Sequence, residues 1–121
     1  MTNREFCLAV NEALEYSDAD QFASDCYLSE IFQGSEEHTD SYISIDQNII
    51  DDLYNIWDVV HMPTAEMRAK MGMTQREFAE RFCISRRTIE NWDSGRRECP
   101  LYLRLMMAEI LGLLTVTREG K

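Results

Sequence analysis

The chain has 121 residues, of which 45% are hydrophobic and 28% are charged, and its formal net charge is −10. A chain of this size and composition forms one compact globular domain, or two very small ones that share a core. No apolar run approaches the roughly 20 residues that a membrane-spanning helix requires, which excludes a transmembrane protein. The first residues, MTNREFC, lack a basic stretch followed by a hydrophobic one, so we expect no signal peptide and a cytoplasmic location.

The acidic charge is concentrated in the first half of the chain. Residues 1–62 contain one basic residue against fourteen acidic ones, a net charge of −13, whereas residues 63–121 have a net charge of +3. Within residues 68–104 there are nine basic residues and five acidic ones. The overall acidity argues against nucleic-acid binding, but the second half meets the need for positive charge at phosphates. We therefore expect an acidic N-terminal half, residues 1–62, and a basic C-terminal half, residues 63–121.

The cysteines and histidines do not form a metal-binding pattern. The four cysteines include no C-x-x-C pair, and His38 and His61 do not have the spacing of zinc ligands. We expect no metal and no other cofactor. Buried, small hydrophobic roles are predicted for Cys7, Cys26 and Cys83, and a helix-capping role for Cys99, which precedes a proline.

Two helices are predicted before residue 33. Thr2 and Glu5 have the spacing of a capping box, which opens the first helix. Ser17–Asp20 ends that helix and begins a second one, which runs to about Phe32. Its apolar face is formed by Phe22, Ala23, Cys26, Tyr27 and Ile31.

A third helix ends the acidic half. Gln33–Ser41 is a polar, acidic loop, and Tyr42–Ile45 alternates weakly, which indicates a short extended segment without a partner strand. Asp46 then caps a helix from Gln47 to about His61. The apolar residues of this helix give the clearest 3.6-residue period in the chain, at Ile49, Ile50, Leu53, Ile56, Trp57 and Val60.

The basic half begins and ends with a helix. Pro63 terminates the preceding helix, and Thr64 caps a short helix, Ala65 to Met71, that Gly72 ends. Pro100 occupies the first position of the last helix, which runs to about Leu114 with apolar residues on more than one face. We expect the tail, Thr115–Lys121, to be mobile. With about seven helices, the predicted fold is all-α.

Between these helices lies Met73–Arg97, which reads as two short helices joined by a tight turn. Thr74 and Glu77 form a capping box for the first helix, whose inner face carries Phe78, Ala79 and Phe82. Ser85 caps the second helix, Ile89 and Trp92 are its buried pair, and Gly95 suits a left-handed C-cap. Two helices joined by so short a turn are typical of a helix-turn-helix, whose second helix lies in the DNA major groove.

This segment resembles the Xre/lambda-repressor-like helix-turn-helix domains over residues 64–114. The matching features are Thr74-Gln75, Ala79, the run ISRRTIENW from Ile84 to Trp92, and the Ser94-Gly95-Arg96 that follows. One residue departs from the pattern, because Cys83 occupies the turn position where the family usually has glycine. A left-handed conformation costs a non-glycine residue roughly 1–2 kcal/mol, which the fold tolerates. The resemblance implies a lambda-repressor-like core of four helices, here preceded by an acidic N-terminal helical extension.

The candidate nucleic-acid-binding residues lie on the outward face of the second helix and at its ends, except for Gln75, which lies at the start of the first helix. Arginine suits guanine and asparagine suits adenine, and which arginine reads a base and which holds a phosphate stays open. The resemblance places Gln75, Arg96 and Arg97 against the DNA backbone. The complete set is Gln75, Ser85, Arg86, Arg87, Thr88, Asn91, Arg96 and Arg97.

The sequence supports two functions of different classes. The first is sequence-specific binding of double-stranded DNA as a homodimeric transcriptional regulator, and the resemblance implies a repressor of a mobile element or a phage-type operon. The dimer interface is expected at Leu101–Leu114, or else at the N-terminal helices. The alternative is a protein-interaction module, an antitoxin or an anti-defence DNA mimic, whose partner binds residues 1–62. No residue spacing indicates a catalytic nucleophile beside a general base, so we expect that the protein is not an enzyme. The acidic residues Glu30, Glu36, Glu37 and Asp40 are interpreted as a solvated loop.

Overall fold

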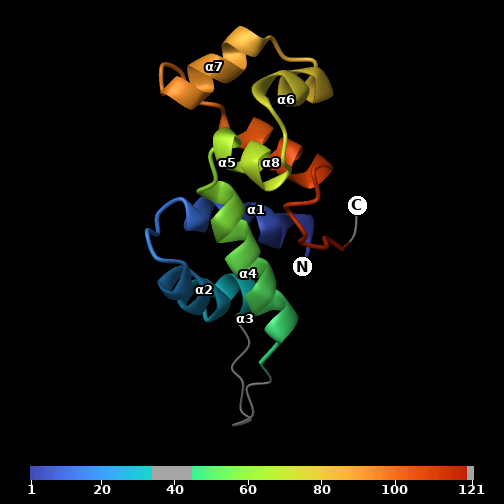
Figure 1. Cartoon of the computed structure of the whole chain (residues 1–121). Helices are drawn as coiled ribbons and strands as arrows, with labels where there is room; N and C mark the ends of the chain where they lie inside the picture. Colours follow the sequence, from blue (N-terminus) through green and yellow to red (C-terminus); the bar gives the residue numbers. More distant parts are fainter. Residues whose placement is uncertain (34–44, 120–121) are drawn as a thin grey trace, which may run out of the picture. The chain divides into compact units, whose positions relative to one another are not determined.

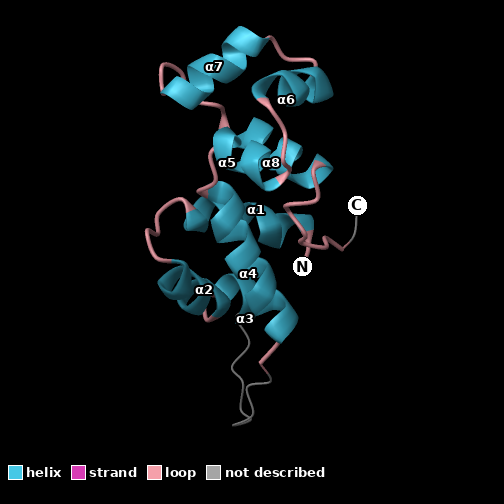
Figure 2. Ribbon diagram, in the orientation of Figure 1, coloured by secondary structure: helices cyan, strands magenta, loops and turns pink. Residues whose placement is uncertain are grey.

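The computed structural model describes residues 1–33 and 45–119. The chain forms two compact units: unit 1 comprises Met1–Val60 and Thr115–Lys121, and unit 2 comprises His61–Leu114 (Figure 1). The regular elements of the described residues are all helices, which confirms the predicted all-α fold (Figure 2). The predicted acidic loop and extended segment lie almost entirely at residues 34–44, outside the described residues, as do Glu36, Glu37, His38 and Asp40.

Unit 1 is built around one long helix. The helices are α1 (Asn3–Ala13), α2 (Ala19–Tyr27), α3 (Glu30–Gln33) and α4 (Gln47–Val60), and α4 packs against both α1 and α2. The apolar period of α4 is what makes this possible, because it places one continuous stripe against the other helices. The core side chains are Ala9, Val10, Ala13, Phe22, Ala23, Cys26, Leu53, Ile56 and Val59.

Local side-chain caps begin the helices of unit 1. Thr2 and Glu5 form the predicted capping box, in which the Glu5 N–H donates to the Thr2 Oγ1 at 3.0 Å. Asp46 caps α4, and its Oδ1 accepts from the N–H of Asn48 at 3.0 Å. Both predicted caps are confirmed. The cap of α2 is Asp18.

The second predicted helix is interrupted, so the prediction of one helix to Phe32 is wrong. The helix α2 ends at Tyr27, and the short α3 follows at Glu30. Ser29 causes the break, because its hydroxyl donates to the carbonyl of Cys26 and accepts from the N–H of Ile31. A serine that bonds its own neighbouring backbone competes with the helical pattern.

The tail does not behave as predicted, because its described residues are bonded to the rest of unit 1. The N–H of Thr115 donates to the Asn55 Oδ1 at 2.8 Å, and the N–H of Glu119 donates to the Met1 carbonyl at 2.7 Å. Thr2 and Glu119 form an isolated parallel bridge. We call this pairing of residues 1–2 with residues 117–119 the terminal clasp. The guanidinium of Arg118 lies 4.3 Å from the centroid of the Phe6 ring, and Val116 is buried.

Unit 2 contains α5 (Thr64–Lys70), α6 (Gln75–Phe82), α7 (Arg86–Ser94) and α8 (Leu101–Ile110). The helix α7 packs against both α5 and α6. Arg104 ties α8 to the start of α5, because its Nη1 donates to the Met62 carbonyl at 3.0 Å. The largest fully buried side chains of the unit are Met67, Phe78, Ile89 and Met107.

Three predicted helix boundaries in unit 2 are shifted. Thr64 does not cap α5 but is buried in its first turn, and Pro63 takes the cap position without a side-chain bond. Pro100 precedes α8 as its cap residue. The same helix ends at Ile110 and not at Leu114, because Gly112 adopts a left-handed φ of 78°. The N–H groups of Gly112 and Leu113 then close the end of the helix on two earlier carbonyls.

The cysteines divide evenly between the interior and the surface. Cys26 and Cys99 are buried, whereas Cys7 and Cys83 are exposed, so the predicted burial is wrong for the latter two. Cys7 lies on the outer face of α1, and Cys83 lies in a surface turn. Among residues 1–33 and 45–119, no group of three or more histidines, cysteines or carboxylates has the arrangement of a metal site. No helix in the described part of the chain is long and apolar enough to cross a membrane.

Candidate nucleic-acid interface

The turn between α6 and α7 has the geometry predicted from the sequence. Thr74 and Glu77 form a reciprocal capping box, with both bonds at 3.1 Å. Cys83 adopts the left-handed conformation, with φ 54° and ψ 42°, and the Ile84 N–H donates to the Ala79 carbonyl at 2.9 Å. Ser85 then caps α7 by accepting from the N–H of Thr88 at 3.2 Å. These local bonds define where α6 ends and where α7 begins.

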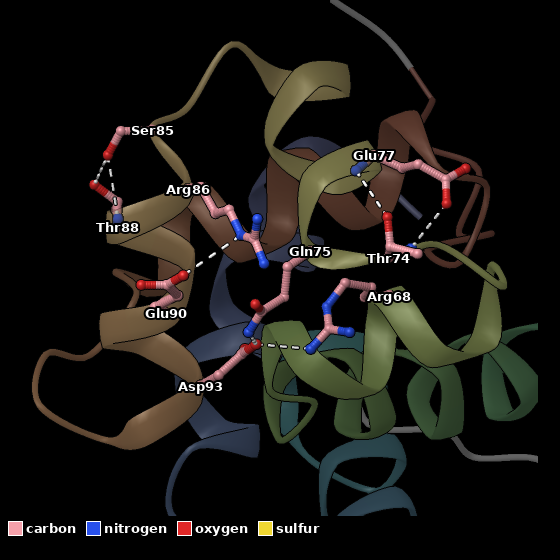
Figure 3. Close-up of polar contacts among 9 residues, drawn as sticks. All are labelled: Arg68, Thr74, Gln75, Glu77, Ser85, Arg86, Thr88, Glu90 and Asp93. Carbon is pink, nitrogen blue, oxygen red and sulfur yellow. Dashed lines mark hydrogen bonds and ion pairs between the residues drawn. The ribbon is translucent and has the colours of Figure 1, made fainter.

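A single carboxylate fixes α7 to the two preceding helices. The Asp93 Oδ2 on α7 accepts from the Nη2 of Arg68 on α5 at 2.7 Å and from the Nε2 of Gln75 on α6 at 2.8 Å (Figure 3). Both members of the ion pair are largely buried, with 21% of the Arg68 side chain and 15% of the Asp93 side chain exposed. Ile89, four residues earlier on α7, is fully buried. The inner face of α7 is therefore held by one apolar anchor and one charged anchor.

Three of the candidate residues, two on the outer face of α7 and one just beyond its end, line one shallow groove. Arg87, Asn91 and Arg96 line this groove, together with Glu90 and Ser94, and its volume is about 400 Å³. Arg87 and Arg96 are exposed, and neither forms an ion pair with any residue that the structure describes. We call Arg87, Asn91 and Arg96 the α7 triad. Its two cations and one amide offer hydrogen-bond donors to a ligand from outside the protein.

Three other candidate residues have partners within α7 or at its N-cap. The Nε of Arg86 lies 3.4 Å from the Glu90 Oε1, although both side chains are more than half exposed (Figure 3). The hydroxyls of Ser85 and Thr88 lie 2.8 Å apart and share a hydrogen bond. An exposed pair of this kind contributes less than about 1 kcal/mol, so Arg86 is free to exchange Glu90 for another acceptor. Ser85 and Thr88 primarily define the start of the helix.

Arg97 lies on a different groove from the α7 triad. That groove has a volume of about 510 Å³, and its lining includes Trp92, Cys99 and Arg104. Trp92 is half-buried rather than buried, because one side of the indole borders this space. Burial raises the pKa of the Cys99 thiol to about 11, and the nearby Arg104 lowers it by less. The structure thus does not bring Arg96 and Arg97 together, although they are adjacent in sequence.

The sequence interpretation missed Arg68, Asp93 and Glu90. Arg68 and Asp93 are 25 positions apart and Gln75 and Asp93 are 18 apart, so no local spacing indicates either contact. The pairing of Arg86 with Glu90 does have a local signal, since opposite charges four residues apart on a helix face each other. Unit 2 as a whole has nine basic and seven acidic residues, a net charge of +2. Because this net charge is small, attraction of an anionic ligand depends mainly on arginines without an ion-pair partner among the described residues, such as those of the α7 triad.

The fold and the exposed basic face define a DNA-binding helix-turn-helix protein. Residues 65–102, from α5 to the start of α8, match the model of a family described as helix-turn-helix. This part of the chain is a helix-turn-helix domain of the Xre/lambda-repressor-like family, which confirms the resemblance seen in the sequence. The family is one of DNA-binding regulators rather than of enzymes, and the protein is a DNA-binding transcription regulator. Comparison with curated proteins found no match, and comparison with solved structures found none.

Proposed function

We propose that the protein is a sequence-specific repressor that inserts α7 into the major groove of its operator. The observation that carries the proposal is the α7 triad: an arginine and an asparagine on the outer face of α7 and an arginine just beyond its end line one groove, neither arginine is ion-paired among the described residues, and the inner face of the helix is anchored. An anchored helix loses little freedom on binding, which favours recognition over non-specific adhesion. The family resemblance supports repression of a mobile-element or phage-type operon as the setting.

The members of the proposed interface have different roles. Arg87 donates two hydrogen bonds to a guanine and Asn91 pairs with an adenine, as their side-chain geometry permits. Arg96, just beyond the end of α7, holds a phosphate, and Arg97 holds a second one from the separate groove that it lines with Trp92. Gln75 keeps one amide hydrogen on Asp93 and presents the other to the DNA backbone.

We further propose that the repressor acts as a homodimer. Tyr102, Met106 and Ile110 follow one another at four-residue intervals on α8, and their exposed fractions are 68%, 57% and 55%. This α8 stripe is an apolar surface on one face of a helix, which suits a two-fold contact in which identical stripes pack together. One recognition helix contacts few base pairs, so two of them, about 34 Å apart on successive turns of DNA, give useful specificity.

The test is selection of bound sequences from random duplex DNA, followed by affinity measurements on the preferred site. Arg87→Ala and Asn91→Ala should each cost about 1–3 kcal/mol on that site and relax the preference at one base pair. Gln75→Ala should weaken binding to all sequences alike, since a phosphate contact carries no sequence information.

Lys70→Ala provides the matched control, because it removes one exposed positive charge from α5, outside the α7 triad. It should lower the affinity slightly and leave the sequence preference unchanged. Retention of full discrimination by both Arg87→Ala and Asn91→Ala would show that α7 is not the reading element. A promoter–reporter fusion then determines the sign of regulation, and we expect reporter output to rise when the gene for the protein is deleted.

A further inference from the structure

Unit 1 contains a groove that the DNA-binding function does not use. It lies between α2 and the first turns of α4, and its volume is about 420 Å³. Ala23 and Tyr27 are buried at its base, and Ile50 and Tyr54 on α4 are half-buried beside them. We call it the α2–α4 groove. It is wide enough to accept two or three side chains from another molecule.

The groove has apolar sides that are unusually exposed. Leu28, just after α2, is 62% exposed, and Ile45, just before α4, is 67% exposed. A single exposed aliphatic residue is ordinary, but here two of them border the same hollow. An apolar centre with a polar rim is the arrangement found at protein–protein interfaces.

Hydrogen bonds hold the groove in its present shape. The hydroxyl of Tyr54 donates to the Asp20 Oδ1 at 2.5 Å, which joins α4 to α2 across one end. The hydroxyl of Tyr27 accepts from the N–H of Asp46 at 2.8 Å, which fixes the start of α4. A preformed site of this kind binds without the entropic cost of ordering its own side chains.

The charge of unit 1 determines which occupant the groove accepts. Residues 1–60 contain fourteen acidic residues and one basic residue, Arg4. Asp20 lines the groove, whereas Asp46 and Asp51 line a separate hollow of the same acidic unit. Such a surface repels nucleic-acid phosphates and attracts a positively charged segment. The occupant is therefore basic as well as apolar.

We propose that the α2–α4 groove binds a basic amphipathic helix of a partner protein. Two aliphatic side chains of that helix, four residues apart, occupy the groove between Leu28 and Ile45, as in other helix-in-groove complexes. Lysine or arginine residues on the flanks of the same helix face Asp20 and the acidic surface of unit 1.

A second copy of this chain is a poorer occupant than a separate partner. The helix α7 carries two arginines, but its one aliphatic residue, Ile89, is fully buried inside unit 2. The exposed α8 stripe has the apolar character, but α8 carries one basic residue, Arg104, and that side chain bonds two carbonyls within unit 2. Neither of these two helices presents exposed aliphatic and basic residues together.

The experiment is a selection from random peptides of about 15 residues, or roughly four helical turns, displayed on phage. The full-length protein is the immobilised target. We expect the enriched peptides to share two aliphatic residues at i and i+4, flanked by lysine or arginine. Binding of a labelled enriched peptide is then measured by fluorescence anisotropy, and its affinity should decrease as salt is added.

The site is located with a matched pair of variants. Leu28→Ser should lower the affinity for the peptide about tenfold or more, which is the loss expected when one buried leucine contact is removed. Leu14→Ser is the control, because Leu14 is 47% exposed in the same acidic unit but does not line the groove. It should change the affinity less than about twofold, and circular dichroism should be the same for both variants.

Each remaining result overturns the proposal. Enriched peptides without the basic and aliphatic pattern, or no enrichment, would show that the groove does not select such a helix. Equal losses from Leu28→Ser and Leu14→Ser would place binding elsewhere on the acidic surface. Self-association in sedimentation that Leu28→Ser abolishes and Leu14→Ser preserves would identify the occupant as a second copy of the chain.

Discussion

Replacing Cys83 by glycine should stabilise unit 2. Cys83 is the one non-glycine residue with a positive φ in the part of the chain that the structure describes. A Cβ in this conformation costs roughly 1–2 kcal/mol, and glycine removes that cost. Glycine also increases the freedom of the unfolded chain, at about 0.5–1 kcal/mol. Because the Cys83 side chain is exposed, little packing is lost. The expected net gain is therefore about 0.5–1 kcal/mol.

The distribution of tryptophans makes this gain measurable. Trp92 is the tryptophan of unit 2, and Trp57 belongs to unit 1. In a Trp57→Phe background, Trp92 fluorescence reports the urea unfolding of unit 2 alone. With a urea m-value of about 1 kcal/mol/M for so small a unit, Cys83→Gly should raise the midpoint by roughly 0.5–1 M.

Cys83→Ala is the control for the loss of the thiol. Alanine keeps the Cβ and so keeps the backbone cost, and its midpoint should match that of the parent. The reasoning fails if Cys83→Gly has the same midpoint as Cys83→Ala or a lower one, because then the left-handed conformation carries no steric cost that glycine relieves.

Three further predictions follow from other parts of the structure. Asp93→Ala leaves a largely buried guanidinium without its carboxylate and should destabilise unit 2 by about 2–3 kcal/mol, below the 3–5 kcal/mol of a fully buried pair; an unchanged urea midpoint would contradict the anchoring role. Met106→Glu places a charge in the α8 stripe and should convert the proposed dimer to a monomer in light scattering, whereas a mass that does not change would exclude that interface. Burial raises the pKa of the Cys26 and Cys99 thiols to about 11, so both stay protonated at pH 8, and mass spectrometry after brief iodoacetamide treatment of the folded protein should show two labels, not four.

The features that the sequence predicted correctly are those with short-range causes. The capping box of Thr74 and Glu77 involves residues three positions apart, and the left-handed turn at Cys83 follows from the family pattern around it. The apolar period of α4 likewise identifies its inner face without knowledge of its neighbours. Boundaries were less reliable, because apolar residues continue past the true ends of α2 and α8. Gly112 marked the end of α8, but Leu113 and Leu114 extended the apolar pattern beyond it.

The features that the sequence did not predict depend on contacts between distant positions. Nothing near Asp93 indicates that it accepts bonds from Arg68 and Gln75 on two other helices. The pairing of Thr2 with Glu119 spans nearly the whole chain. For the candidate site, the helix-turn-helix pattern identified the arginines, and the four-residue spacing of Arg86 and Glu90 is a local signal for their pairing. The grouping of Arg87 with Arg96 on one groove, and the placement of Arg97 on another, depends on the three-dimensional structure.

The terminal clasp gives the chain the topology of an inserted domain. The polypeptide leaves unit 1 after Val60, forms the whole of unit 2, and returns at Thr115, so two peptide connections join the units. A protease that cuts one connection would not release unit 2 as a free fragment, because the other connection still holds it. Mechanical load applied between Thr2 and Glu119 would act first on the parallel bridge, and unit 2 would experience no tension until that bridge opened.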